Sequence, residues 1–409
     1  MLHDPQRHQR LDSAAWDAGA ARRAIERIVA DAEAAFSPPT YWPIHPRDAD
    51  PSDSASSAAE PFYPLYFGAC GVIWALAHLR DVGAVRLQRS YEEFVEPLLA
   101  RNRAWLAREN LTEPASYLMG ETSILMLMYS MRPVPRSADR LAELIESNID
   151  NKARELMWGA PGTLLAAQLL HAHTNDARWA ELFRTTARTL WSRLEWSDEF
   201  ACRYWTQDLY GARSSYIDGV HGFVGTALPL IRGRHLLDAD EWRAWQRCID
   251  DTVRATATVD GDCANWRAWL VPPAGRKGGA MLMQYCHGAP GFIVNLAESP
   301  STELDDLLVA GGEATWRAGP LAKGSNLCHG TGGNGYAFLK LFARTRDARW
   351  LDRARAFAMH GIAQTDAEAQ RTGRMRYSLW TGDIGFAIFL WNCIEATASF
   401  PTLDTFFTH

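Results

Sequence analysis

The sequence lacks several features that would place it in common classes of protein. No apolar run reaches the roughly 18 residues that a transmembrane helix needs, so no membrane-spanning segment is expected. The net charge of −6 is not the basic excess of a nucleic-acid-binding protein. The first residues are polar and lack the apolar core of a secretory signal, which favours a cytoplasmic location. Seven cysteines scattered over 409 residues do not form a disulfide framework.

Apolar residues are abundant, and their spacing predicts helices. They make up 47% of the chain, which can bury a large core. Strand-like alternation is scarce. The segment 1–36 carries apolar residues at helical spacing over 10–36 and predicts an amphipathic helix. Residues 37–62, rich in Pro, Ser and Asp, predict a loop that could act as a lid. The rest, 63–409, is predicted to form one domain together with the N-terminal helix.

A Gly-x-x-Gly pattern divides residues 63–409 into seven repeats, the second of which is degenerate. The repeats are about 40–65 residues long, which is room for two helices and two loops. Each glycine pair is followed by a run that is apolar nearly all round, typical of a buried helix, and then by an amphipathic stretch. This pattern predicts an all-α fold in which seven inner helices, ringed by outer helices, close into a toroid. The first glycines are Gly68, Gly120, Gly159, Gly222, Gly288, Gly330 and Gly382.

Two repeats carry the same Cys-His-Gly string, at 286–288 and 328–330. If the inner helices begin at equivalent places, their N-termini meet at one mouth of the ring, where the helix dipoles favour thiolates. Cys286, Cys328 and one histidine would then offer Zn²⁺ three ligands and leave an open position, as in catalytic zinc sites.

The spacing leaves the choice of histidine open. The residue before the first glycine is histidine in three successive repeats: His221, His287 and His329. A fourth protein ligand from His287 or His221 would instead make a closed, structural zinc site. The two cysteines could also be ordinary buried core residues.

The motifs around these residues resemble those of the lanthionine synthetase C-like family, which comprises lantibiotic cyclases and stand-alone relatives. The resemblance extends from about Tyr63 to Asn392. Its most specific parts are Gln284-Tyr-Cys-His-Gly-Ala-Pro-Gly291 and Leu327-Cys-His-Gly-Thr-Gly-Gly-Asn-Gly-Tyr336.

This resemblance implies a double α-barrel of seven inner and seven outer helices. It also implies one zinc ion held by Cys286, Cys328 and His329. It gives His221 a role in proton transfer. Glu155 stands where the cyclases carry an aspartate that assists this histidine.

Other positions separate the two branches of the family. His287 stands where stand-alone relatives carry histidine and some lantibiotic cyclases carry tyrosine, and is a further candidate for proton transfer. Lys323 stands where glutathione-binding relatives carry lysine, and Arg374 or Arg376 could similarly face an anionic substrate. Leu282 replaces an arginine of the lantibiotic cyclases. These features favour the stand-alone branch and glutathione or another thiol as a partner.

The resemblance therefore predicts a zinc-dependent enzyme that adds a cysteine or glutathione thiol to a dehydroalanine or dehydrobutyrine residue. Its partners would be a dehydrated peptide or protein and a thiol donor. Two other hypotheses stay open. One is a non-catalytic, zinc-containing adaptor that binds glutathione or peptides. The other is a carbohydrate-active toroid, which would need two carboxylates across the mouth. The candidates for that pair are Glu121, Glu155, Asp218 and Asp383.

Overall fold

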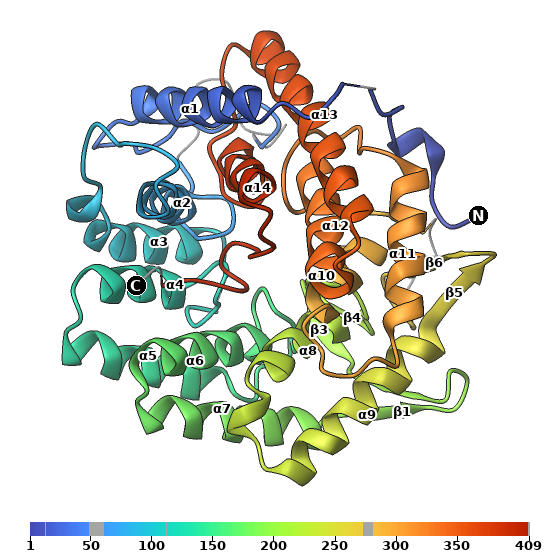
Figure 1. Cartoon of the computed structure of the whole chain (residues 1–409). Helices are drawn as coiled ribbons and strands as arrows, with labels where there is room; N and C mark the ends of the chain where they lie inside the picture. Colours follow the sequence, from blue (N-terminus) through green and yellow to red (C-terminus); the bar gives the residue numbers. More distant parts are fainter. Residues whose placement is uncertain (13, 49–60, 112, 273–280, 408–409) are drawn as a thin grey trace.

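The computed structural model describes residues 1–12, 14–48, 61–111, 113–272 and 281–407. Within these residues the chain forms fourteen α-helices, three two-stranded antiparallel hairpins and three short 3₁₀ helices. Figure 1 shows the α-helices arranged as a closed ring, with an inner set surrounded by an outer set. The prediction of an all-α toroid with seven inner and seven outer helices is confirmed.

Each inner helix begins directly after the first glycine of a repeat. These helices are apolar on every side because every side meets protein; all eight residues of the shortest one, α10, are buried. The inner helices are α2 (Ala69–Asp81), α4 (Glu121–Met131), α6 (Ala160–Thr174), α8 (Phe223–Arg232), α10 (Ala289–Leu296), α12 (Thr331–Thr345) and α14 (Asp383–Glu395).

The outer helices are amphipathic and have one wet face. In the outer helix of the fourth repeat, Trp245, Ile249 and Val253 face the core. The outer helices are α1 (Ala18–Ala35), α3 (Glu96–Arg108), α5 (Pro135–Asn148), α7 (Ala177–Ser192), α9 (Ala239–Thr256), α11 (Asp305–Ala318) and α13 (Ala348–Thr372). Helix α1 packs against α14 and α13, and so closes the ring between its first and last repeats (Figure 1).

The N-terminal helix is shorter than the predicted range 10–36. It begins at Ala18 because the side chain of Asp17 accepts a hydrogen bond from the Ala20 N–H and caps the helix there. Leu11 and Ala15, which had suggested an earlier start, lie outside it.

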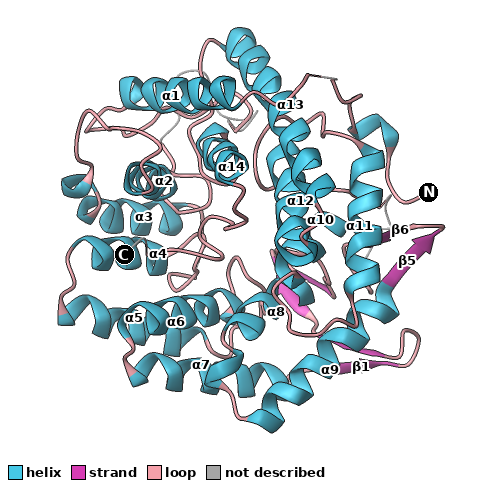
Figure 2. Ribbon diagram, viewed as in Figure 1, coloured by secondary structure: helices cyan, strands magenta, loops and turns pink. Residues whose placement is uncertain are grey.

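The strands form three small hairpins that the sequence pattern did not reveal. Strands β1 (Glu195–Ser197) and β2 (Cys202–Tyr204) pair, as do β3 (Gln207–Leu209) and β4 (Ala212–Ser214), both pairs lying between α7 and α8. Strands β5 (Ala257–Asp260) and β6 (Cys263–Trp266) follow α9. Figure 2 shows β1 and β5 at the outer edge of the ring.

Seven mouth loops, each of seven residues ending at the first glycine of a repeat, connect the repeats in a closed circle of hydrogen bonds. They are residues 62–68, 114–120, 153–159, 216–222, 282–288, 324–330 and 376–382. Each loop is joined to the next by one of these bonds. In the first four, Tyr66 N–H donates to Leu118 C=O, Ser116 Oγ–H to Met157 C=O, Leu156 N–H to Val220 C=O, and Tyr285 Oη–H to Gly219 C=O. In the last three, Cys286 N–H donates to Cys328 C=O, Cys328 N–H to Trp380 C=O, and Trp380 N–H to Tyr66 C=O. The ring mouth is therefore one connected surface.

The second glycine of the repeat is needed for close packing under these loops. A Cβ atom at Gly333 would lie 1.9 Å from the carbonyl oxygen of Leu327, and one at Gly291 would lie 2.0 Å from that of Tyr285. No side chain fits such a gap, so glycine is required where the loop folds back over the helix start. The loops that carry Cys286 and Cys328 are held against α10 and α12 in this way.

The C-terminal segment fills the centre of the ring (Figure 1). Phe400 packs against the rings of Tyr285, Tyr336 and Trp380, which come from three different repeats. Asp404 forms an ion pair with the buried Lys340 of α12. The segment thus supports the inner side of the mouth loops.

The predicted loop at 37–62 is described only in part. Its residues 37–48 are ordered against the ring, with Tyr41, Trp42 and His45 buried. The proposed lid function falls largely on residues 49–60, which lie outside the described residues. Among the helices of the described chain, none combines the length and the apolar character needed to cross a bilayer.

Candidate metal centre

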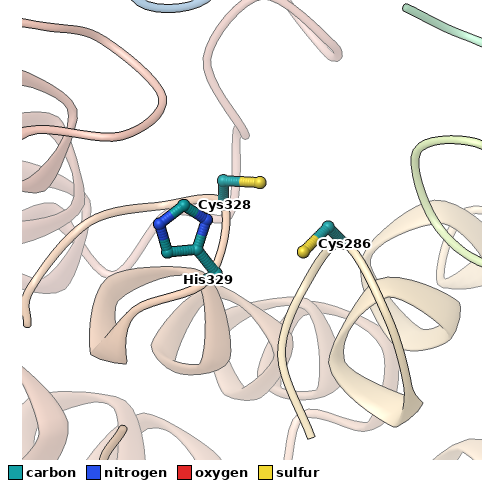
Figure 3. Close-up of side chains that lie close together, drawn as sticks. All are labelled: Cys286, Cys328 and His329. Atoms are coloured by element: carbon teal, nitrogen blue, oxygen red, sulfur yellow. The ribbon is translucent and has the colours of Figure 1, made fainter. Parts of the chain in front are cut away.

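Cys286, Cys328 and His329 come together at the ring mouth. They belong to two neighbouring mouth loops, which are joined by a 3.0 Å hydrogen bond from the Cys286 N–H to the Cys328 carbonyl. One ligand atom from each side chain lies within 4.8 Å of the others. Figure 3 shows both sulfurs and the imidazole turned toward the same space. Among the described residues, no further His, Cys, Asp or Glu completes this group.

Each sulfur accepts a hydrogen bond from a neutral side chain. The Tyr66 hydroxyl donates to Cys328 Sγ over 2.8 Å, and the Gln284 side-chain amide donates to Cys286 Sγ over 3.0 Å. Both sulfurs are nearly inaccessible to solvent, with Cys286 8% and Cys328 2% exposed. Such donors stabilise negative charge on sulfur in a site that excludes most water.

The two thiols ionise as a pair. A hydrogen bond from Cys286 lowers the pKa of Cys328 well below its usual range against the effect of burial, and His329 and Tyr66 lower it further. Burial, and then the hydrogen bond and charge of Cys328, raise the pKa of Cys286 well above its usual range. Without a cation the pair therefore keeps one shared proton and one negative charge, and a divalent cation would displace that proton.

The donor set fits a soft divalent metal. Two thiolates and an imidazole are the ligands that Zn²⁺ prefers, and three protein ligands leave one coordination position for a further group. The closed four-ligand site considered above would need His221 or His287, and neither belongs to the group whose ligand atoms lie within 4.8 Å of one another.

The first of these histidine–carboxylate pairs joins His221 to Glu155. The distance from His221 Nδ1 to Glu155 Oε2 is 2.8 Å, and Glu155 is fully buried. Glu155 also accepts hydrogen bonds from the N–H groups of Met157 and Trp158, which fix its position. The imidazole is therefore held in one orientation, with Nε2 left for other partners.

Negatively charged neighbours raise the pKa of the His221 imidazole. Burial alone would lower its pKa, but the hydrogen bond and charge of Glu155, followed by the charges of Asp218 and Cys328, raise it to about 9. A pKa raised in this way favours the imidazolium form at neutral pH, which is the form that can donate a proton.

The second pair, His287 with Asp218, was not predicted. His287 Nδ1 lies 2.6 Å from Asp218 Oδ2, and Asp218 Oδ1 accepts hydrogen bonds from the N–H groups of Val220 and His221. The two pairs follow one rule: the histidine just before the first glycine of one repeat bonds the acidic residue four positions before the first glycine of the preceding repeat.

This rule shows that the sequence contained a signal for Asp218. The position four residues before the first glycine is acidic in two repeats, Glu155 and Asp218. Alignment at this position would have found Asp218. Nothing comparable marks Tyr66 or Gln284, because their contacts with the sulfurs depend on loop conformation.

The three predicted substrate-binding cations lie in different environments. Lys323 and Arg374 are exposed. Arg376 is half-buried and forms a bidentate ion pair with Asp48, so its charge is already neutralised. A backbone contact also connects Lys323 to the same segment, since Arg47 donates to its carbonyl.

The carboxylates of the carbohydrate hypothesis all have partners. Glu155 and Asp218 hold the two histidines, Glu121 forms a bidentate pair with Arg103, and Asp383 accepts from Ser325 and from the Arg376 N–H. Their surroundings therefore account for them without a sugar.

The fold and the site together define an α,α-toroid with a two-cysteine, one-histidine centre at its mouth. The family model described as lanthionine synthetase C-like protein matches residues 62–405. The chain therefore belongs to the lanthionine synthetase C-like family, and the predicted resemblance is confirmed.

Individual relatives agree with this assignment. The chain is 25% identical over 385 residues to the protein named glutathione S-transferase LANCL1 from Danio rerio, covering 88% of this chain and 87% of that protein. It is 34% identical over 119 residues, 27% of each chain, to LanC-like protein GCL1 from Arabidopsis thaliana. The solved structure of nisin cyclase superposes with a TM-score of 0.60 at 15% identity, covering 81% of this chain and 88% of that chain, which supports the fold alone.

Proposed function

We propose that this protein is a zinc-dependent enzyme that forms thioethers. It would add the thiol of glutathione or of a peptide cysteine to a dehydroalanine or dehydrobutyrine residue of a peptide or protein. The observation that carries the proposal is the group of Cys286, Cys328 and His329, whose ligand atoms lie within 4.8 Å of one another, together with the pairing of His221 and Glu155 at the same mouth.

The metal would activate the thiol, and the His221 imidazolium would donate a proton. Held by Cys286, Cys328 and His329, Zn²⁺ would supply Lewis acidity that lowers the pKa of a thiol and leaves its sulfur nucleophilic. The sulfur would form a bond to the β-carbon, and the π electrons of the Cα–Cβ double bond would move to give an enolate, leaving a single bond between these carbons. His221 donates its proton from Nε2 to the α-carbon, and the proton released by the thiol restores the balance.

The remaining side chains would position these groups. Glu155 holds His221 by its Nδ1 and raises its pKa, so that the proton donor is charged at neutral pH. His287, held by Asp218, faces the same mouth and is a second candidate for proton transfer. Lys323 and Arg374 are the exposed cations available to an anionic thiol donor.

The name of the Danio rerio relative favours glutathione as the donor. Leu282 stands where the lantibiotic cyclases carry an arginine, and this difference also favours glutathione. The location is proposed to be cytoplasmic, where glutathione is abundant and thiols stay reduced.

The test combines metal analysis with a mass-spectrometric addition assay on a dehydroalanine peptide and glutathione. The wild-type protein should contain one zinc and yield the adduct. Cys328→Ala should lose both zinc and adduct, whereas His221→Ala should keep zinc and lose turnover. Cys202→Ala, which removes a buried thiol of β2, is the matched control and should keep both. Adduct formation by a metal-free Cys328→Ala protein would refute the mechanism, and zinc without adduct in the wild type would favour an adaptor.

A further inference from the structure

The turn of the β3–β4 hairpin contains a residue that the turn itself does not favour. Tyr210 and Gly211 join the two strands, and both have positive φ, +53° and +74°. Two such residues define a type I′ turn, for which Asn-Gly or Asp-Gly is preferred. A bulky side chain in this backbone region is strained by about 1 kcal/mol or more. Hairpin stability therefore does not explain the tyrosine.

The side chain of Tyr210 is fixed to the ring mouth. Its hydroxyl accepts a 2.8 Å hydrogen bond from the indole N–H of Trp158, and the two rings meet edge to face at 6.4 Å. Trp158 occupies, in its repeat, the position that histidine occupies in the next three. In Figure 2 this hairpin lies inside the outline of the ring, beside α8, unlike β1 and β5.

A short series of contacts connects Tyr210 to the proton donor. The backbone N–H of Trp158 donates to Glu155, and Glu155 holds His221. Trp158 is buried, whereas Tyr210 is 71% exposed. The strained tyrosine thus presents an open aromatic ring, anchored by its hydroxyl, next to the group that would protonate the substrate.

Aromatic rings also lie against the two histidines. Tyr216 stacks with His287 at 6.4 Å, and Trp269 meets Tyr216 edge to face at 5.5 Å. The exposed cations Lys323 and Arg374 belong to other loops, and Arg213, on β4 of this hairpin, lies opposite the acidic Asp208 of β3, so the two charges offset each other. An uncharged, planar or apolar group therefore fits beside Tyr210 better than an anionic thiol donor does.

We propose that Tyr210, anchored by Trp158, is the binding platform for the acceptor peptide and selects an apolar or aromatic side chain next to its dehydro residue. The proposal rests on the proposed function, because that function makes His221 the donor to the acceptor's α-carbon. A peptide reaching His221 from the hairpin side would pass over the ring of Tyr210, and its neighbouring side chain would cover the exposed face.

The decisive variant is Tyr210→Asn, which creates the preferred Asn-Gly turn and removes the ring. We expect a melting temperature equal to or above that of the wild type. For a dehydroalanine peptide with a neighbouring phenylalanine, KM should rise three- to tenfold while kcat and the KM for glutathione stay unchanged. With glycine as the neighbour, the two proteins should differ by less than twofold. Tyr210→Phe keeps the ring and should resemble the wild type more closely than Tyr210→Asn does.

Two results would overturn the platform. One is a KM in Tyr210→Asn that equals the wild-type value for the phenylalanine peptide; the other is a melting temperature lowered by several degrees, which would make Tyr210 a structural anchor. Trp196→Ala, on the outer hairpin, is the matched control for loss of an exposed aromatic ring. Calorimetric binding of an unreactive peptide, with alanine for dehydroalanine, separates the two proposals: failure of catalysis abolishes the adduct in the wild type, whereas failure of the platform leaves peptide affinity equal in both proteins.

Discussion

Glu155→Gln removes a buried negative charge beside His221 while keeping the shape of the side chain. Glu155 accepts hydrogen bonds from Met157 N–H, Trp158 N–H and His221 Nδ1, and the glutamine oxygen can still accept one of the backbone bonds. The substitution therefore tests whether Glu155 acts through its charge or through the conformation of its loop.

The size of the effect follows from the pKa of His221. Burial lowers this pKa, and Glu155 is the first of the groups that together raise it to about 9 from the ordinary value of 6.5. The difference corresponds to about 3 kcal/mol of preference for the proton. Loss of the carboxylate removes the largest of the contributions that raise the pKa and returns it toward the ordinary value of 6.5. At pH 8 the protonated fraction then falls from about nine-tenths to about 3%, whereas at pH 6 most of the imidazole is protonated in both proteins.

A proton donor with a raised pKa is active below that pKa and is lost as the pH rises through it. Glu155→Gln should therefore reduce turnover about 30-fold at pH 8 and less than threefold at pH 6, and NMR titration should show the His221 pKa moving down. Glu121→Gln, at the start of α4 and paired with Arg103, is the matched control and should keep the wild-type pH profile. Equal losses at pH 6 and pH 8 would refute the electrostatic argument.

Three other substitutions test the surrounding structure. Phe400→Ala should lower the free energy of unfolding in urea by about 3–5 kcal/mol, because its ring packs among three others at the centre of the toroid; unchanged stability would remove the C-terminal segment from the core. Asp404→Asn should cost about 3 kcal/mol in the same assay by leaving the buried Lys340 without one of its two partners, whereas Asp306→Asn, at an exposed site, should cost little. Lys323→Ala should raise the KM for glutathione severalfold with zinc content unchanged, and an unaltered KM would exclude it from the thiol site.

The repeat architecture was predictable because its signals are local. Gly333 and Gly291 are required by close backbone contacts, and the runs that follow them are apolar because the inner helices are buried. Helix bounds were less predictable: α1 begins after its cap, Asp17, and not at residue 10 as the apolar spacing suggested. The three hairpins were missed because strands of three or four residues are too short to show alternation.

Register predicted that Cys286 and Cys328 meet, since equivalent positions of neighbouring repeats adjoin in a closed ring, whereas the choice of His329 among the three histidines came from the family resemblance. The pairing of His287 with Asp218 was missed although its signal, an acidic residue four positions before the first glycine, is in the sequence. The contact of Tyr66 with Cys328 was not predictable, because it joins different repeats through side-chain geometry. The ion pair of Arg376 with Asp48 was not predictable either, because it joins the last repeat to the segment that precedes the first repeat.

X-ray absorption at the zinc edge of the purified protein tests the central claim most directly. Cys286, Cys328 and His329 predict two sulfur scatterers at about 2.3 Å together with lighter atoms, and saturating glutathione should raise the sulfur number to three. Absence of zinc, or two sulfurs that do not change when the thiol is added, would contradict the account.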